Sequence, residues 1–206
     1  MEDVPEVYAK PRDAKRPLVC LDEFCKQLTG EAREVLPVQP GQAARQDYEY
    51  VRFGMCSVFM LYSPLEHRRE VRVTGQRTAR DYARTIQWMC DVMHPAADKI
   101  VLVQDNLNTH GPASLCEAIA PAEALRLKER IEWHDTFKHG SWLNMAEIEI
   151  GMAQRQCLDR RMADATVMTG ELQRWSADRN KATAGTDWQF TTADARIKLK
   201  RLYLQL

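Results

Sequence analysis

Three carboxylates in this chain are spaced so that a folded domain could gather them around a metal ion. Asp22 follows the apolar run 18–21, Asp105 follows the mostly apolar run 100–104, and Glu147 lies in a stretch that predicts a helix. Runs rich in Val, Ile and Leu are typical of buried strands, so both aspartates should lie at the rim of a sheet. Carboxylate oxygens held close together there can bind a hard divalent cation, which offsets their mutual repulsion. The pattern therefore predicts a magnesium site.

Taken one at a time, the three acids have ordinary explanations. Asp105 with Asn106 is typical of a turn that ends a strand, Asp22 of a surface charge, and Glu147 of an acid favoured by the dipole at a helix start. Only their joint placement points to a metal site. An arrangement in which the acids never converge stays an alternative, and a metal-soaked crystal would decide between the two.

The residues around the acids resemble those of a known family. The motifs that carry the resemblance are Cys-Leu-Asp-Glu at 20–23, Val-Gln-Asp-Asn-Leu-Asn-Thr-His at 103–110 and Lys-His-Gly-Ser-Trp-Leu-Asn-Met-Ala-Glu at 138–147. They are similar to the catalytic domain of DDE transposases, which are DDE superfamily endonucleases, in the bacterial insertion-sequence branch related to mariner elements. In that family an Asp-Asn pair with a nearby His carries the second acid, and Leu-Asn-x-x-Glu carries the third. The resemblance runs from about residue 1 to about residue 161.

This resemblance implies an α/β fold of the RNase H-like type, the integrase and transposase catalytic core, with a mixed five-stranded sheet flanked by helices. It also implies a DNA transposase that uses two Mg²⁺ (or Mn²⁺) ions for phosphodiester hydrolysis and strand transfer. Asp22 would share both ions, and Asp105 and Glu147 would each complete one. Water attack would nick the element end, and the freed 3′-hydroxyl would then join it to target DNA by in-line displacement.

The partners implied by the resemblance are the DNA of the element ends and target DNA, with a TA dinucleotide as the target. A helix-turn-helix region normally recognises the element ends in this family, and we expect it upstream or on a separate polypeptide. The chain is then interpreted as a catalytic fragment, a product of a split reading frame or a decayed copy. A homodimer is a further expectation.

Five polar residues near the acids are candidates for supporting them or for contacting DNA: Asn106, His110, Lys138, His139 and Asn144. Lys138 and His139, together with the amides that open the following helix, could hold a phosphate, because helix N-termini favour anions. His110 is more often a hydrogen-bonding loop residue than a catalyst. Asn144 could equally cap the helix.

Two ambiguities affect the choice of acids. On a helix that begins near Ser141, Glu147 and Glu149 point about 160° apart, so one ion cannot readily recruit both. Helix geometry alone does not choose between them, but the family pattern selects Glu147 and leaves Glu149 as a solvated residue. Between Asp22 and Glu23, alternation selects Asp22 only if it shares its face with residues 18 and 20, and the motif also favours Asp22.

The pattern along the chain predicts one α/β domain. Strands are expected at 18–21, 48–53, 55–61, 69–73, 100–104 and 131–134, and helices at 78–93, 112–119, 122–130 and from about Ser141 onward. With right-handed crossovers, the strands that precede Asp22 and Asp105 can lie side by side and parallel. The expected divisions are an irregular lead-in at 1–17, a catalytic core at 18–162 with an inserted loop at about 26–47, and a helical, basic C-terminal tail at 163–206.

Composition sets the remaining limits. The 206 residues are 45% hydrophobic, which is enough for one substantial core. No apolar stretch approaches the roughly 20 residues of a membrane span, and the first residues lack a secretory signal, so we expect a cytoplasmic protein that is nucleoid-associated when bound to DNA. The six cysteines show neither a C-x-x-C pair nor a zinc-like spacing, which favours reduced, mostly buried thiols.

Net charge is the feature that fits DNA binding least well, because 29 basic and 29 acidic residues cancel. DNA affinity would then depend on local patches. The candidates are Arg68, Arg69, Arg72, Arg77, Arg80 and Arg84, then Arg155, Arg160 and Arg161, and finally Arg196, Lys198, Lys200 and Arg201. Such clusters are more often solvated faces than DNA tracks.

Two further functions stay open on the sequence. Another RNase H-like nuclease would act on RNA or structured DNA, and activity on an RNA–DNA hybrid would favour it. An inactive DNA-binding or subunit-pairing domain that regulates a full-length transposase would bind DNA without metal and without cleavage.

Overall fold

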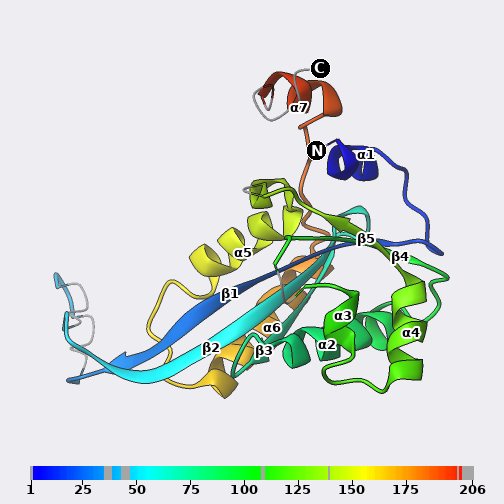
Figure 1. Ribbon diagram of the computed structural model, residues 1–206. Helices are drawn as coiled ribbons and strands as arrows, with labels where there is room; N and C mark the ends of the chain where they lie inside the picture. Colours follow the sequence, from blue (N-terminus) through cyan, green and yellow to red (C-terminus); the bar gives the residue numbers. More distant parts are fainter. Residues whose placement is uncertain are drawn as a thin grey trace.

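The computed structural model describes residues 2–34, 39–42, 47–107, 110–138, 140–198 and 200, and a five-stranded sheet forms its centre (Figure 1). The strands are β1 (Leu18–Glu31), β2 (Tyr50–Ser63), β3 (Arg68–Thr74), β4 (Ile100–Gln104) and β5 (Ile131–Asp135). Their order across the sheet is β3-β2-β1-β4-β5. The first three form an antiparallel meander, while β4 and β5 run parallel to β1. The mixed five-stranded sheet predicted from the sequence is thus confirmed.

The neighbouring strands β1 and β4 carry the geometry on which the site depends. Leu18 lies opposite Val101 and Cys20 lies opposite Val103 in a parallel register. Apolar side chains on both faces bury these strands on two sides, as is usual for parallel pairs. The same register continued by two residues brings Asp22 opposite Asp105, which follows the end of β4. Asp22 was expected at the end of its strand, but it lies within β1, which continues to Glu31.

Helices cover both faces of the sheet (Figure 1). Those in the described residues are α1 (Asp3–Tyr8), α2 (Ala79–Trp88), α3 (Pro112–Leu115), α4 (Pro121–Arg130), α5 (Met145–Gln156), α6 (Ala165–Lys181) and α7 (Thr192–Lys198), with short 3₁₀ turns η1 (Pro64–Glu66) and η3 (Ser141–Leu143) and a π-helical turn η2 (Met89–Met93). Strand alternation sends Leu18 and Cys20 into a core shared with α1, α5 and α6. Val19 and Leu21 point into the opposite core, shared with α2, α3 and α4.

The helix predicted at 78–93 begins as expected. The Thr78 side chain accepts a hydrogen bond from the backbone N–H of Asp81, and the Asp81 carboxylate accepts one from the Thr78 backbone at 3.0 Å. This capping box satisfies N–H groups that would otherwise lack partners at the helix start. The α-helix ends at Trp88 and continues as the π-helical turn to Met93.

The first two strands are longer than predicted. Residues 26–31, expected in an inserted loop, extend β1, and the strands expected at 48–53 and 55–61 form the single strand β2. Its two parts are joined at a bulge, where the register shifts and Gly54 adopts a φ of 105° that favours glycine. The far end of this hairpin extends away from the body of the molecule (Figure 1), so it lacks the buried pattern that marks a strand in sequence.

Described segments before and after the expected core, 18–162, also pack into the hydrophobic core. Residues 1–17 were expected to be irregular, yet α1 buries Val4 and Val7 in the core. In the expected C-terminal tail, α6 buries Met168 and Leu172 in that same core, so packing continues past residue 162. Helices α1 and α7 lie side by side near the two termini (Figure 1).

The six cysteines are all free thiols, and Cys25 and Cys116 are the two exposed ones. This confirms the reduced, mostly buried cysteines predicted from their spacing. Across the described residues, no helix combines the length and apolar character needed to cross a membrane.

Candidate active site

Asp22 lies within β1 with only 6% of its surface exposed. It follows Leu18 and Cys20 at two-residue intervals, and both of those side chains belong to the core beneath α5. Asp22 therefore points toward α5, which satisfies the condition set on the sequence for preferring it to Glu23. Glu23 points to the opposite face of the sheet.

Asn144 fixes the start of α5 against β1. Its side-chain oxygen accepts a hydrogen bond from the Ala146 backbone at 3.1 Å, so it is the N-cap. Its amide nitrogen donates to the Leu21 carbonyl at 2.8 Å and lies 3.4 Å from Asp22 Oδ2. The α-helix thus begins at Met145, later than the predicted start near Ser141, because residues 141–143 form a 3₁₀ turn.

The cap positions Glu147 in the first turn of α5, where its backbone N–H donates to the Asn144 carbonyl at 3.1 Å. Its side chain is exposed, whereas Asp22 beside the helix start is buried. The Asn144 side chain therefore links the strand that bears Asp22 to the helix that bears Glu147.

The acids influence one another electrostatically. Burial raises the pKa of Asp22 to about 8, and the negative charges of Glu147 and Asp105 contribute to the rise. The backbone N–H of Glu23, which donates to Asp22 Oδ1 at 2.8 Å, acts in the opposite direction. A buried carboxylate facing two like charges needs a compensating cation, and an all-oxygen donor set suits a hard one. The donor chemistry of these residues therefore fits a divalent metal.

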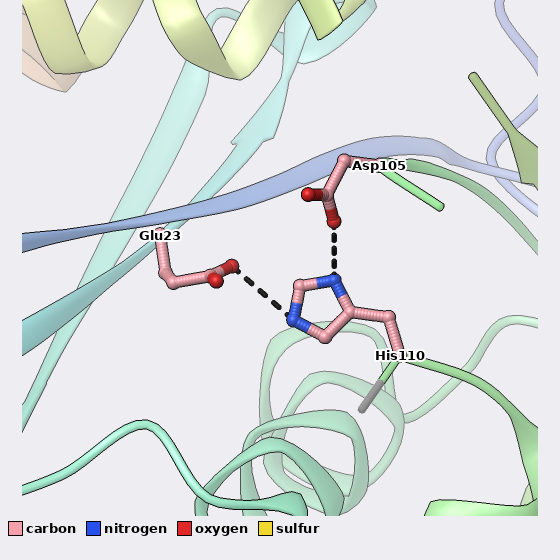
Figure 2. A group of neighbouring side chains, drawn as sticks. All are labelled: Glu23, Asp105 and His110. Atoms are coloured by element: carbon pink, nitrogen blue, oxygen red, sulfur yellow. Dashed lines mark hydrogen bonds and ion pairs between the residues drawn. The ribbon is translucent and has the colours of Figure 1, made fainter. Parts of the chain in front are cut away.

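A second group of side chains meets at the same edge of the sheet (Figure 2). The ring of His110 lies between two carboxylates, with Nδ1 2.5 Å from Asp105 Oδ1 and Nε2 3.2 Å from Glu23 Oε2. Burial disfavours the charged ring, but the hydrogen bonds and charges of Asp105 and Glu23 outweigh it and raise the pKa of His110 to about 9. Ligand atoms of these three residues all lie within 4.8 Å of one another.

Glu23 in this group was not predicted as a site residue. The Asp22-Glu23 pair contained a usable signal, because alternation in a strand directs neighbouring side chains to opposite faces. The position of His110 on the face that Glu23 reaches could not be read from the sequence, since it depends on how the loop after β4 folds back. Asp105 itself lies in that loop with its side chain 20% exposed.

Glu149 is not the solvated residue that was expected. It is 1% exposed, and its carboxylate binds the guanidinium of Arg69 at 2.9 Å and that of Arg179 at 3.1 Å. Arg69 comes from β3 and is fully buried, and Arg179 comes from α6. Glu149 lies on the flank of α5 opposite Glu147, as helix geometry predicted, but that flank is covered by α6 and β3.

The remaining candidates lie around the rim. Asn106 is exposed in the loop after β4, and Lys138 is exposed in the connection between β5 and η3. His139 lies outside the described residues. Neither Asn106 nor Lys138 is part of the groups formed around Asp22 and His110.

Several arginines expected to contact DNA form ion pairs within the protein. Arg161 pairs with Glu31 at 2.5 Å and secures the β1–β2 hairpin, while Arg196 pairs with Glu2 at 2.7 Å and joins α7 to the N-terminus. Arg201 lies outside the described residues. Because these arginines pair with acids of the same chain, a cluster of basic residues in the sequence does not by itself predict a basic surface.

Other arginines stay exposed. Arg80 and Arg84 on α2 line an open surface hollow together with Gln76. Arg77, which precedes α2, has a side chain that is 57% exposed and lies 3.6 Å from Glu23. This basic surface is therefore next to the group around His110.

Comparisons with known proteins identify a family and a fold. The family model described as DDE superfamily endonuclease matches residues 17–168. A search of curated proteins found no match.

Solved structures similar to this chain include the Mos1 mariner paired-end complex with Mn, at 15% identity and a TM-score of 0.58, covering 88% of this chain and 56% of that one. A Mos1 transposase paired-end complex with the left transposon end matches at 14% identity and a TM-score of 0.55, covering 82% of this chain and 51% of that one. The Mos1 strand transfer complex matches at 14% identity and a TM-score of 0.55, covering 90% and 59%. The chain thus spans little more than half the length of these proteins. The likeness is one of fold, and it confirms the predicted RNase H-like architecture.

Proposed function

The chain belongs to the DDE superfamily of endonucleases, and from this we propose that it is the catalytic domain of a transposase that cuts and joins DNA. The observation that carries the proposal is the shared electrostatic environment of Asp22, Asp105 and Glu147. Burial raises the pKa of the Asp22 carboxyl, and the charges of Glu147 and Asp105 raise it further. A bound cation would offset both effects.

We propose that Asp22, Asp105 and Glu147 hold the metal, with Mg²⁺ or Mn²⁺ as the ion. Their oxygen donors match the preference of these hard cations. One of the similar solved structures is a Mos1 complex with Mn, which agrees with this choice. When bound, the ions would supply charge stabilisation at the attacking and leaving oxygens of a phosphodiester.

Residues of the chain hold the three acids in place and leave them accessible to DNA. Asp22 is held within a paired strand, and Asn144 ties the helix that bears Glu147 to that strand. Glu147 is exposed and Asp105 is partly exposed, so a DNA backbone can approach from their side. In the first step water attacks phosphorus and a 3′-hydroxyl leaves; in the second, that hydroxyl attacks target DNA and displaces another 3′-oxygen.

For DNA contact we propose the exposed arginines beside the site, Arg77, Arg80 and Arg84. Guanidinium groups bind phosphates, and such contacts position a duplex without reading its sequence. Asn106, Lys138 and His139 are proposed as further DNA-contacting residues at the rim of the site.

The proposed partners are the DNA of the element ends and target DNA with a TA dinucleotide, and we place the reaction in the cytoplasm at the nucleoid. End recognition is assigned to an upstream helix-turn-helix region on the same or a separate polypeptide. A homodimer is proposed because Val51, Phe53 and Met55 are exposed apolar residues on the β1–β2 hairpin. Light scattering of the purified chain tests the dimer, and a monomeric mass would contradict it.

The central test is nicking of a labelled duplex in Mg²⁺ by the variants Asp22→Asn, Asp105→Asn and Glu147→Gln. Each keeps the size of the side chain and removes a charge. We expect activity to fall below about a thousandth of wild type, which corresponds to about 4 kcal/mol in the barrier.

Glu129→Gln is the matched control, because Glu129 is an exposed acid on α4 that lies outside the site. It should cut like wild type. If Glu147→Gln retains full activity, the assignment of the third acid is wrong. Cleavage of an RNA–DNA hybrid without any strand transfer would instead favour another RNase H-like nuclease.

A further inference from the structure

We propose that Glu23 and His110 are positioning residues that hold the Asp105 carboxylate in the orientation needed to bind metal. The inference rests on the proposed function in one respect, since it takes Asp105 to be a metal ligand. It assigns a role to a buried acid, Glu23, that neither the motif nor the charge pattern of the sequence required.

Asp105 needs external support because of where it lies. It comes directly after Gln104, the last residue of β4, and does not itself belong to a helix or strand. The contact between Asp105 Oδ1 and His110 Nδ1 at 2.5 Å fixes one carboxylate oxygen (Figure 2). The backbone N–H of His110 donates to the Leu107 carbonyl at 2.9 Å, which holds His110 close to the segment that bears the acid.

The far side of the ring is anchored on the central strand. Glu23 Oε2 is fully buried, and the polar group that faces it is His110 Nε2 at 3.2 Å. Glu23 belongs to β1 and follows Asp22 directly. The pair of contacts therefore connects the loop acid to the strand that carries the first acid, through one rigid imidazole.

One face of the His110 imidazole is also in contact with another side chain. Tyr82 stacks on His110 with centroids 4.6 Å apart and an angle of 18° between the planes. The Tyr82 hydroxyl donates to Gln104 Oε1 at 2.7 Å, and Gln104 Nε2 donates to Asp135 Oδ1 at 3.0 Å. With its two edges and one face in contact, the imidazole has little freedom to rotate.

The same contacts argue against His110 as a metal ligand. Each ring nitrogen already faces a carboxylate oxygen, and direct coordination at about 2.0–2.1 Å would require one of those oxygens to be displaced. Mg²⁺ prefers oxygen donors. A histidine that orients a ligating carboxylate through a hydrogen bond fits the geometry better, and partners of this kind typically change metal affinity by about 10–100-fold.

The test is calorimetric titration of the metal-free protein with Mn²⁺, with thermal unfolding of each variant as a check on folding. We expect Asp105→Asn to abolish binding at its site and His110→Ala and Glu23→Ala to weaken binding by about 10–100-fold. His110→Asn should recover part of the loss, because its amide can take the place of Nδ1 against Asp105. If His110→Ala does not fold, Glu23→Gln, which keeps the side-chain size, carries the test.

His94→Ala is the matched control, because His94 is also a buried histidine but bonds Ser63 at 3.3 Å instead of an acid of the site. It should bind Mn²⁺ as wild type does. Electron spin-echo spectroscopy of the Mn²⁺ complex adds a direct measure of coordination, and we expect no coupling of the strength given by a directly bound imidazole nitrogen.

The outcomes separate this inference from the function on which it rests. Unchanged Mn²⁺ affinity in His110→Ala and Glu23→Ala, with binding lost in Asp105→Asn, would overturn the positioning role alone. Strong nitrogen coupling that disappears in His110→Ala would make His110 a ligand and also overturn it. Unchanged binding in Asp105→Asn would overturn both the metal site and the inference.

Discussion

Among single residues, Asp22 has two features that destabilise its charged form in the folded protein. It is a buried carboxylate, and it faces the charges of Glu147 and Asp105. The hydrogen bond donated by the Glu23 backbone N–H offsets only part of this destabilisation. An acid retained under such conditions is more consistent with a functional than with a stabilising role.

The first prediction follows from the pKa of Asp22. Because the folded-state pKa of about 8 lies above the ordinary value near 4, the folded protein holds a proton between those pH values that the unfolded chain has released. Stability of the metal-free wild type should therefore fall as the pH rises through this window. Asp22→Asn should be more stable than wild type at pH 8 by at least about 1 kcal/mol.

Urea unfolding of both proteins in chelator, at pH 8 and at pH 5, measures this difference. The advantage of Asp22→Asn should shrink at the lower pH, where wild-type Asp22 is protonated. An advantage that is equal at both pH values would show that charge is not its cause.

The second prediction concerns the choice of metal. Mg²⁺ and Mn²⁺ should support nicking, whereas Ca²⁺ should allow binding without cleavage, because its looser and more variable coordination positions the reacting groups less well. Nicking rates in each ion, with binding followed separately, give the comparison. Full activity in Zn²⁺ combined with none in Mg²⁺ would contradict the all-oxygen site and point to histidine ligands.

At the scale of elements, α5 is held from two sides. Asn144 ties its first turn to β1, and Glu149 ties its buried flank to Arg69 of β3 and Arg179 of α6. Asn180 of α6 strengthens this junction, because its side chain exchanges two hydrogen bonds of 2.9 Å with the Arg69 backbone. The helix that bears Glu147 is thus fixed at its start and along its length.

The third prediction is that Glu149→Gln lowers the free energy of unfolding by about 3–5 kcal/mol, because it leaves a fully buried guanidinium without a counter-charge. Glu171→Gln is the control. Glu171 forms ion pairs with Arg160 and Arg174 at the surface, where solvent screens the charges and the loss of one partner has little effect on stability. Equal, small losses in the two variants, measured by urea unfolding, would show that the buried pair contributes no more than a surface one.

Over the whole molecule, positive and negative charges balance, and several charged side chains form ion pairs within the protein. The net charge is zero, and arginines such as Arg161 and Arg196 join distant segments through ion pairs. The basic groups left exposed beside the site are few. Affinity for DNA should therefore come from a small number of phosphate contacts.

The fourth prediction is that this chain binds DNA weakly, with a steep salt dependence and less than about 1,000-fold preference between specific and scrambled duplexes. The double change Arg80→Ala with Arg84→Ala should reduce the salt slope by about 2, whereas Lys128→Ala on α4 should leave it unchanged.

Dissociation constants over a salt series on both duplexes provide the measurement. Fusion of an upstream helix-turn-helix region should add end recognition without altering the metal requirement. Discrimination well above about 1,000-fold by the chain alone would mean that it contains a sequence-reading element of its own.

Features that depend on residues close together in the chain could be predicted from the sequence. The apolar runs before Asp22 and Asp105 predicted two strands, the order of elements predicted their parallel pairing, and Thr78 predicted the start of α2. These signals are local, because strand and helix periods repeat over a few residues. The motifs around the acids added the family and its fold.

The residues that cover each face of those strands and helices could not be predicted in the same way, because they come from distant parts of the chain. Helix geometry placed Glu149 opposite Glu147, but its burial depends on Arg69, which is 80 residues away in the chain. The contact of Glu23 with His110 likewise joins two segments whose separation in sequence says nothing about their distance in space. Burial and charge pairing are properties of packed surfaces, and a periodic pattern in one segment does not specify the partner that another segment brings to it.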